Sequence, residues 1–428
     1  MSRIIVIGGG WAGCAASLSA RQAGADVVLL ERADSLLGAG QVGGIMRNNG
    51  RFTATEEMIA MGGGDLLKLT DDCARHANME FPGHKHASLY DVAVMEPVVR
   101  RHLQEKQVEI WTVSRATKVE VSDGKIQFVE LESGQRFEGD AFIDATGTMG
   151  PQGNCRKYGN GCAMCVTRCP TFGGRVSIAG RAGVQEMKAK RVDGSFGSMS
   201  GSCKLNKDSL DESIVRELEH TGVAVIPLPK QVAKKKQELL KIKSCQQYAL
   251  PAFAENVVLL DTGHAKLMSP FYPLIELRNI PGLENARFED PYSGGIGNSI
   301  RFLAMSPRNN HLKVEGVDNL FCGGEKAGML VGITEAISTG TLAGHNAVRH
   351  ALRKELFELP PSLCVGDMIA YVKEEMRTEE GMFKKFTFSG SVYFDRMKEL
   401  GLYSTEVEQI QARVSETGLT DFFAKKVA

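Results

Sequence analysis

A strand, a glycine turn, a helix and a second strand follow one another between Arg3 and Glu31. This βαβ order constrains the fold more than any other stretch of the chain. The apolar run Arg3–Ile7 leads into the letters GGGWAG, a helix of small residues follows, and the apolar run Val27–Leu30 ends at the acidic Glu31. A glycine turn between two strands, with an acid after the second strand, predicts a dinucleotide-binding unit.

The residues of the turn have separate tasks in such a unit. Gly8 makes the tight turn, Gly10 lets a pyrophosphate approach the backbone, and Gly13 lets the helix pack close to the strand. The phosphates lie at the helix N-terminus, where free N–H groups and the helix dipole favour negative charge. Trp11 and Ala12 begin that helix, and Glu31, followed by Arg32, is placed to accept hydrogen bonds from a ribose. A glycine-rich surface loop, the alternative interpretation, does not explain Glu31.

Composition places the chain among ordinary globular proteins. Its 428 residues suffice for two or three domains, and 51 basic residues balance 51 acidic ones. Because these charges cancel, the chain as a whole has no electrostatic attraction to nucleic acid or an anionic membrane. A local basic patch is still compatible with this composition. No apolar run reaches membrane-spanning length and the chain starts with a strand, so we expect a cytoplasmic protein. Its ten cysteines are then metal ligands, redox groups or buried thiols rather than disulfides.

The sequence after Glu31 predicts a loop, two helices and a sheet. Leu36–Gly44 is a second glycine-rich loop, in which Gly43 and its neighbours let the backbone run past a flat ring system; a plain mobile loop is the alternative. Ala54–Ala77 and Asp91–Lys106 are predicted helices, and Phe81–His86 between them is interpreted as a solvated loop. Val108–Thr112 is a predicted strand.

A β-meander is predicted over Thr117–Phe142, with turns at Asp123-Gly124 and Ser133-Gly134. It leads into an apolar strand that ends in Asp144-Ala145-Thr146-Gly147. Much later, Asn319–Gly328 contains the turn Gly323-Gly324-Glu325, and a helix is expected from about Gly332 to Arg349.

Together with the first βαβ unit, these motifs resemble the glutathione-reductase-like FAD oxidoreductases. The resemblance implies an α/β fold: a Rossmann-like FAD-binding domain with a β-meander, an inserted α+β domain and a helical C-terminal segment. It implies that Gly324 and Glu325 bind the ribityl–pyrophosphate part of FAD. The helix N-terminus at Gly332 and Ile333 would face the flavin pyrimidine edge and stabilise a reduced, anionic flavin. Ala145, Thr146 and Gly147 complete the expected cofactor site.

A narrower resemblance involves four later segments: Ile280–Ala286, Ala343–Ala347, Val365–Tyr371 and Phe386–Phe394. They are similar to the branch that holds glucose-inhibited division protein A and the folate- and FAD-dependent tRNA uridine-5-methyltransferases. The similarity covers roughly residues 1–150 and 275–395. It is specific for FAD and only suggestive for the substrate.

One segment departs from the methyltransferase pattern. That family carries a cysteine in a Cys-Ser-Asn-Ser-Leu-Arg segment after the second glycine loop, whereas this chain has Ile45–Arg51 without a cysteine. The missing cysteine weighs against methyltransferase activity.

A cysteine cluster follows the meander. Cys155, Cys162, Cys165 and Cys169 have the spacing C-x6-C-x2-C-x3-C, and Pro170 follows directly. The tail of this run resembles the ending of the bacterial ferredoxin motif, which favours a [4Fe–4S] cluster. A zinc site and a redox or structural thiol cluster are the alternatives. Cys203 is an alternative to Cys155 as the fourth ligand.

The predicted domains are a discontinuous FAD-binding domain (1–150 and 311–352), an inserted cysteine-cluster and substrate domain (151–310) and a C-terminal helical segment (353–428). The last is a cap or an oligomerisation element. Phe271–Pro273 and Pro291–Ser299 are interpreted as lining the flavin's open face, with buried packing as the alternative.

A basic helix is predicted over Lys230–Lys243 in the inserted domain. It would meet RNA phosphates or an acidic electron-transfer partner, and a solvated helix face is the alternative. The lysines in question are Lys234, Lys235, Lys236, Lys241 and Lys243.

These patterns lead us to expect an FAD-dependent oxidoreductase that couples two-electron flavin chemistry to a [4Fe–4S] cluster. NAD(P)H or a ferredoxin is the candidate electron source, and a small molecule or an electron carrier the partner. One alternative is a methylenetetrahydrofolate- and FAD-dependent tRNA uridine-C5 methyltransferase. Another is a non-catalytic flavin electron-transfer subunit. No convincing general acid or base is evident; the candidates by location alone are His264, His311, Arg301 and Tyr292.

Overall fold

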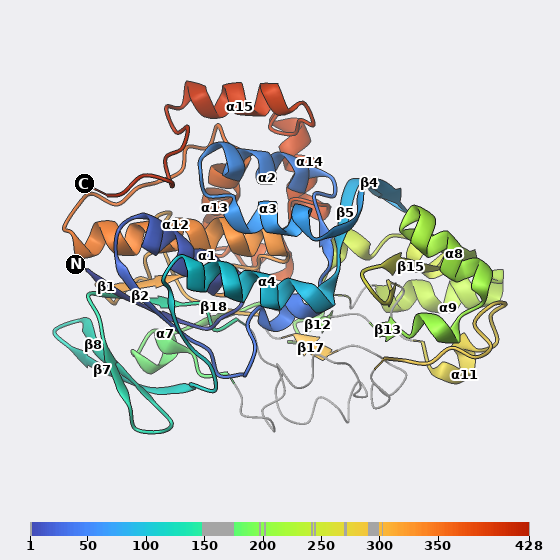
Figure 1. The fold of residues 1–428 in the computed structure, drawn as a ribbon, viewed down its shortest axis with the longest axis horizontal. Coiled ribbons are helices and arrows are strands. Elements are labelled where there is room, and N and C mark those ends of the chain that lie inside the picture. Colours follow the sequence, from blue (N-terminus) through green and yellow to red (C-terminus); the bar gives the residue numbers. More distant parts are fainter. Residues whose placement is uncertain are drawn as a thin grey trace.

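The computed structural model describes residues 2–147, 175–196, 198–200, 203–240, 243, 245–268, 272–289, 299–301 and 303–427. Figure 1 shows the described part as a body built around a parallel sheet, with an inserted domain (green and yellow) on one side. The C-terminal helices (red) lie across the body's top in this view. No described helix is long and apolar enough to cross a membrane.

A five-stranded parallel sheet forms the centre of the body, in the order β19-β10-β1-β2-β6. Four of its strands are apolar and almost fully buried because helices and loops cover both faces, whereas the edge strand β6 is only partly buried. The predicted first βαβ unit is thereby confirmed, with helix α1 (Trp11–Gln22) between two of the strands. The strands are β1 (Arg3–Ile7), β2 (Asp26–Leu30), β6 (Glu109–Trp111), β10 (Ala141–Asp144) and β19 (Leu320–Cys322).

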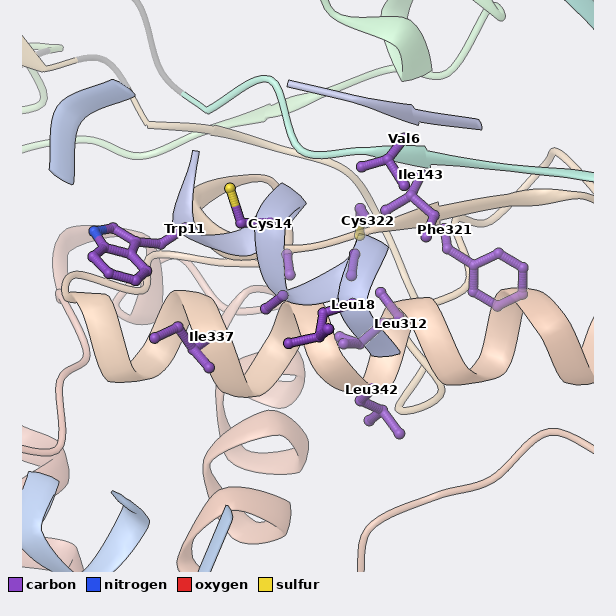
Figure 2. Close-up of a cluster of buried hydrophobic side chains, with 14 of the residues drawn as sticks. Val6, Trp11, Cys14, Leu18, Ile143, Leu312, Phe321, Cys322, Ile337 and Leu342 are labelled. Carbon is purple, nitrogen blue, oxygen red and sulfur yellow. The ribbon is translucent and has the colours of Figure 1, made fainter. Parts of the chain in front are cut away.

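Helix α1 packs against α12 (Ile333–Ala351), the late helix that the sequence predicted, and the two run side by side in Figure 2. Glycines make this contact close. A Cβ atom at Gly340 would overlap the carbonyl of Ala12, and one at Gly344 would overlap the carbonyl of Ala16. The two backbones therefore touch, and the N-termini of both helices stay at one end of the sheet.

The meander is confirmed as a three-stranded antiparallel sheet, whereas the helix expected over Ala54–Ala77 is wrong. That stretch contains two helices and the start of a strand, because the glycines at positions 62–64 interrupt the helical pattern. The Phe81–His86 stretch is the tight end of a hairpin with His84 buried, so the loop interpretation is also corrected. The elements are β7 (Ala116–Ser122), β8 (Lys125–Leu131), β9 (Arg136–Glu138), α2 (Gly50–Ala60), α3 (Asp65–Asp72), β3 (Ile45–Met46), β4 (Ala74–Phe81), β5 (His84–Tyr90) and α4 (Val92–Glu105).

The inserted part contains a four-stranded antiparallel sheet in the order β13-β16-β15-β14. One face of this sheet packs against its own helices, and the other faces the hairpin of β4 and β5 in a separate apolar cluster. Its elements are β13 (Cys203–Leu205), α8 (Glu212–Thr221), β14 (Val223–Pro227), α9 (Lys230–Leu240), α10 (Ala252–Glu255), β15 (Asn256–Asp261), β16 (Ala265–Leu267) and α11 (Leu274–Leu277).

Short elements connect the inserted part to the body, and helices close the chain. The short elements are α7 (Ile178–Arg181), β11 (Met187–Lys188), β12 (Ser198–Ser200), β17 (Ser299–Arg301) and β18 (Ala304–Met305). The closing helices are α13 (Cys364–Glu375), α14 (Ser391–Glu399) and α15 (Val407–Glu416).

The glycine contact between α1 and α12 predicts an unusual mutational effect. In an ordinary helix Gly→Ala stabilises by up to about 1 kcal/mol, but Gly340→Ala forces the two backbones apart. We expect a loss of about 1–3 kcal/mol in the free energy of unfolding, measured by urea denaturation. The control is Gly180→Ala in α7, where the new methyl group meets only the Ser177 side chain at 3.4 Å. Equal stabilisation by both substitutions would contradict the close contact.

Candidate functional site

A cavity of about 640 Å³ lies where the sheet's carboxyl edge, the N-terminus of α12 and the inserted domain meet. Its volume is in the range of small-molecule and cofactor sites. Of the fifteen residues predicted to bind the cofactor, only Gly13 does not line it. The lining members are Gly8, Gly10, Trp11, Ala12, Glu31, Arg32, Gly43, Ala145, Thr146, Gly147, Gly324, Glu325, Gly332 and Ile333.

The first glycine turn has the geometry that a pyrophosphate requires. Gly8 has φ +103°, and a side chain there would overlap the carbonyl of Ala145. A Cβ at Gly13 would overlap the carbonyl of Gly8, so this glycine serves helix–strand packing and not the cavity. At Gly10, by contrast, an added Cβ meets no atom within 4 Å. The backbone is thus bare toward the cavity at the N-terminus of α1, as the predicted pyrophosphate site requires.

The Glu31 carboxylate already accepts hydrogen bonds from the backbone next to it and from the glycine turn. Its carboxylate accepts hydrogen bonds from the backbone N–H of Gly9 at 2.6 Å and of Ala33 at 2.8 Å. Burial raises the pKa of Glu31, while these two N–H groups oppose the rise. A carboxylate has further lone pairs, so the predicted contact to a ribose hydroxyl is compatible with this geometry.

Asp144 fixes the turn at the other side of the cavity. This buried carboxylate accepts from the Thr146 hydroxyl at 2.6 Å and lies 3.6 Å from the ammonium of Lys326. Burial acts to raise the pKa of Asp144, but Lys326 and the Thr146 hydrogen bond outweigh it and the net shift is downward. The turn Ala145–Gly147 is therefore held rigid where it borders the cofactor cavity.

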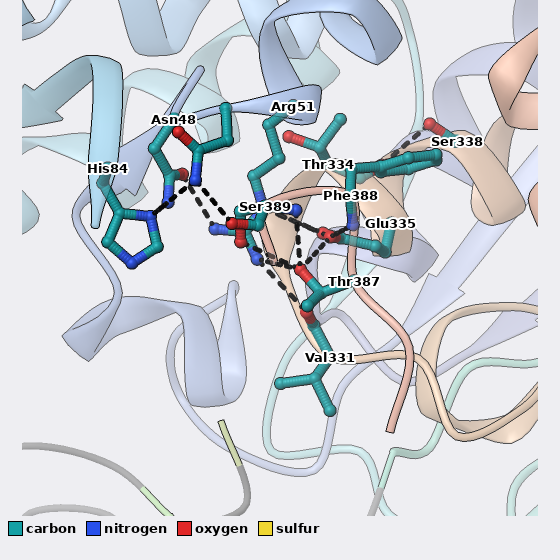
Figure 3. A network of polar contacts seen from close by, with 11 residues as sticks. Asn48, Arg51, His84, Val331, Thr334, Glu335, Ser338, Thr387, Phe388 and Ser389 are labelled. Atoms are coloured by element: carbon teal, nitrogen blue, oxygen red, sulfur yellow. Dashed lines mark hydrogen bonds and ion pairs between the residues drawn. The ribbon is translucent and has the colours of Figure 1, made fainter. Parts of the chain in front are cut away.

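A buried ion pair supports the N-terminus of α12 (Figure 3). Arg51 Nε lies 3.2 Å from Glu335 Oε1, and neither side chain is more than 4% exposed. Glu335 Oε1 also accepts from the Thr387 hydroxyl at 2.7 Å and from the N–H of Phe388 at 2.9 Å. Arg51 donates to the carbonyl of Val331 at 3.1 Å and itself lines the cavity. No sequence motif marks this pair, because it joins positions 284 residues apart.

His84 links the α2 region to the inserted domain. Its Nδ1 lies 2.9 Å from the Asn48 amide and its Nε2 lies 3.0 Å from the carbonyl of Gln247. Burial lowers the pKa of His84 to about 3, so the ring is neutral near pH 7. It serves as a connector and not as a general acid.

The inserted domain forms one wall of the cavity, which we call the insertion wall. Its members were not predicted as cofactor or catalytic residues. Cys245, one of the ten cysteines expected to be metal ligands, redox groups or buried thiols, is only half-buried and lines the cavity. The residues of the insertion wall are Lys243, Cys245, Gln247, Tyr248, Lys266 and Met268.

Some residues were named as acid–base candidates only because of their place in the sequence. Those that the structure describes do not line the cavity. His264 lies 3.1 Å from Glu289 and His311 belongs to the body; neither borders the cavity. Tyr272 is 1% exposed in the core of the inserted domain and does not line the flavin side, so buried packing accounts for it. Tyr292 and the Arg301 side chain lie outside the described residues.

Two of the five lysines proposed to meet RNA point inward. Lys236 pairs with Glu276 at 3.1 Å and lies 3.8 Å from the Tyr272 ring centre, while Lys243 is part of the insertion wall. Lys241 and the side chains of Lys234 and Lys235 lie outside the described residues.

The cysteine cluster cannot be placed, because Cys155, Cys162, Cys165 and Cys169 lie outside the described residues, as does the side chain of Cys203. In the part of the chain that the structure does describe, no three His, Cys, Asp or Glu side chains gather as a metal site would require.

Three features meet at one cavity: the parallel sheet, the glycine turn before α1 and the N-terminus of α12. Together they define an FAD-binding protein of the glutathione-reductase-like class. Comparison with known proteins narrows this class. The family model described as "Glucose inhibited division protein A" matches residues 3–250 and 273–355, and the chain belongs to this family.

The individual relatives either match only part of this chain or share little sequence identity with it. A stretch of 97 residues is 38% identical to the methylenetetrahydrofolate–tRNA-(uracil-5-)-methyltransferase TrmFO of Caldicellulosiruptor bescii, covering 22% of this chain and 21% of the relative. TrmFO of Brevibacillus brevis is 34% identical over 96 residues, with the same shares. The match thus spans about a fifth of these relatives' length. A crystal structure of Aquifex aeolicus GidA superimposes with TM-score 0.65 and 16% identity, over 97% of this chain and 76% of that one.

The bare backbone at Gly10 predicts a selective loss of cofactor. Gly10→Val has room in the empty protein and an ordinary φ of −66°, but its side chain fills the space of the pyrophosphate. We expect purified Gly10→Val to contain less than about a tenth of the FAD of the wild type. Its urea denaturation should match that of wild-type protein stripped of FAD. Normal FAD content in the variant would show that the phosphates bind elsewhere.

The buried Arg51–Glu335 ion pair predicts that a second substitution partly restores the stability lost with the first. Arg51→Met leaves a buried carboxylate without its cation and should cost about 3–5 kcal/mol in the free energy of unfolding. Adding Glu335→Gln removes that charge but keeps an acceptor for Thr387 and Phe388, and should restore about half of the loss. Denaturant unfolding of the single and double variants measures the coupling. Additive losses would contradict a direct interaction.

Proposed function

We propose that this chain is an FAD-dependent tRNA-modifying enzyme that transfers a one-carbon unit from methylenetetrahydrofolate to C5 of a uridine. Membership of the glucose inhibited division protein A family supports this proposal, as do the names of the TrmFO relatives. The observation that carries it is the insertion wall, which adds a thiol and two lysines to the cofactor cavity. The methyltransferase alternative is thereby preferred over the flavin–cluster oxidoreductase that the cysteine spacing suggested.

The two sides of the cavity suit the two parts of such a reaction. Reduced FAD would supply the electrons that turn a transferred methylene group into a methyl group. On the body side, Gly10 and the N-termini of α1 and α12 would hold the dinucleotide. On the opposite side, the insertion wall would hold the base and the one-carbon donor.

Cys245 is the residue we assign to activation of the uracil ring. C5 of uracil becomes nucleophilic when a thiolate adds to C6, and the thiolate leaves again when the C5 proton is lost. The segment Ile45–Arg51 provides no cysteine for this step, whereas Cys245 is a free thiol within the cavity. Lys243 lines the same wall of the cavity.

RNA would approach from the basic side of α9. Since Lys236 and Lys243 point inward, we assign phosphate contacts to the exposed Lys230 and to Lys234 and Lys235. Such contacts weaken with rising salt because bound counterions are released.

A second candidate is the flavin–[4Fe–4S] oxidoreductase, which one structural observation favours. Gly147 and Arg175 flank the cysteine segment, both line the cavity, and Arg175 donates to the Gly147 carbonyl at 2.5 Å. The described residues on either side of the segment therefore border the cavity. About four irons and four acid-labile sulfides per chain in protein purified without oxygen would support this candidate.

The proposed function predicts a methylation that depends on Cys245. Wild-type protein with reduced FAD and ¹³C-methylenetetrahydrofolate should convert uridine in unmodified tRNA to 5-methyluridine carrying the label, as read by mass spectrometry. Cys245→Ser should lower this rate on the order of 100-fold or more while FAD content stays unchanged. Cys73→Ser, at a half-buried cysteine away from the cavity, is the control. A wild-type protein that incorporates no label, or a fully active Cys245→Ser, would exclude this mechanism.

A further inference from the structure

Gln247 places a buried side-chain amide in the insertion wall. The residue is 3% exposed and lines the cavity. Its Oε1 has no hydrogen-bond partner among the residues that the structure describes. Buried amide oxygens are nearly always satisfied in native proteins, so this atom marks a place where a bound ligand supplies a hydrogen-bond donor.

The surroundings of Gln247 fix the backbone that carries this amide. The carbonyl of Gln247 lies 3.0 Å from His84 Nε2. A Cβ atom at Gly390 would come within 2.6 Å of Gln247 Cβ, so the glutamine packs where Gly390 has no side chain. The ring of Tyr248, the next residue, lies 4.9 Å from the His84 ring between centres. The amide is therefore presented to the cavity from a backbone that is held in place before a ligand binds.

Gln41, a second glutamine that lines the cavity, has a structural role instead. Its Nε2 donates to the Ser35 hydroxyl at 2.8 Å and to the carbonyl of Leu36 at 2.6 Å. The Gln41 amide thus holds the second glycine-rich loop together. Within the described structure the oxygen of Gln247 has no comparable task, although it is buried more deeply.

A primary amide is complementary to a ring edge that has an N–H beside a carbonyl. The amide oxygen accepts from the N–H, and the amide NH2 group donates to the carbonyl. Uracil has such an edge at N3 and O4. Its C6 lies across the ring from N3, so a thiol at C6 and an amide at N3 can contact one uracil together. Cys245, which we assign to C6, precedes Gln247 by two residues and lines the same wall.

We propose that Gln247 recognises the substrate base, with its side-chain amide paired to the N3–H and O4 edge of the uracil. This inference rests on the proposed function and adds the residue that selects the base. The flavin and the pterin of a folate carry the same kind of edge. The flavin edge is expected at the N-terminus of α12, at Gly332 and Ile333, whereas Gln247 shares the insertion wall with the Cys245 thiol. We therefore assign the amide to uracil.

The test is a titration of the FAD-loaded protein with uridine 5′-monophosphate and with its N3-methyl analogue, followed by flavin absorbance and by calorimetry. The wild type should bind the parent nucleotide about 10- to 100-fold more tightly, because the analogue leaves the buried amide without its donor. Gln247→Leu should weaken binding of the parent nucleotide and reduce this ratio about 10-fold. The bulk of the added methyl group acts in both proteins, so the change in the ratio isolates the hydrogen bond.

Two further variants complete the test. Gln247→Met keeps the length of the side chain and carries the same prediction, which guards against a folding defect of the leucine variant. Gln246→Leu is the matched control and should keep the wild-type ratio. Gln246 is the adjacent glutamine, donates to the carbonyl of Lys243 and does not line the cavity.

A wild-type protein that does not distinguish the two nucleotides, or that binds neither at about 10 mM, would overturn the proposal. So would Gln247→Leu and Gln247→Met proteins that keep the wild-type ratio. Weaker binding of FAD by such variants would then assign the amide to the flavin, and weaker binding of 6-methylpterin would assign it to the one-carbon donor. No methyl group is transferred in this titration. A chain inactive in methylation can therefore still pass it, and an active one can still fail it.

Discussion

The backbone contact between α1 and α12 is the constraint on which the site depends. Gly340 and Gly344 let α12 lie against the carbonyls of Ala12 and Ala16, and this proximity brings two helix N-termini to one cavity. Each N-terminus presents unpaired N–H groups and a partial positive charge. A dinucleotide with a central pyrophosphate and an electron-accepting ring at one end fits two such positive helix ends.

The two sides of the cavity differ in the charged groups that they carry. Its cofactor side carries both acids and arginines beside bare glycine backbone, namely Glu31, Asp34, Glu325, Arg32, Arg51, Arg115 and Arg175. Its insertion wall carries Lys243, Cys245 and Lys266. A neutral protein as a whole thus contains a local cationic wall, which the equal counts of acidic and basic residues did not reveal. The wall exists only because the inserted domain folds back over the loop that precedes β3.

The cofactor half of the site was predictable because each of its motifs is local. Gly8, Gly10 and Glu31 lie in one βαβ unit, and the pattern of strand, glycine turn and acid defines their tasks without further information. The insertion wall was not predictable, because Lys266 reaches Val42 across 224 positions and no short motif marks such a contact. The helix predicted over Ala54–Ala77 failed for a related reason: its periodic pattern continued through glycines that end a helix.

The most direct test of this account is a crystal structure of the FAD-loaded protein. We predict the pyrophosphate over Gly10 at the N-terminus of α1, with the isoalloxazine ring between the Gly40–Gly43 loop and the insertion wall, facing Cys245. A flavin ring that lies away from Lys243, Cys245 and Lys266 would contradict the assignment of the insertion wall to the substrate, and with it the proposed reaction.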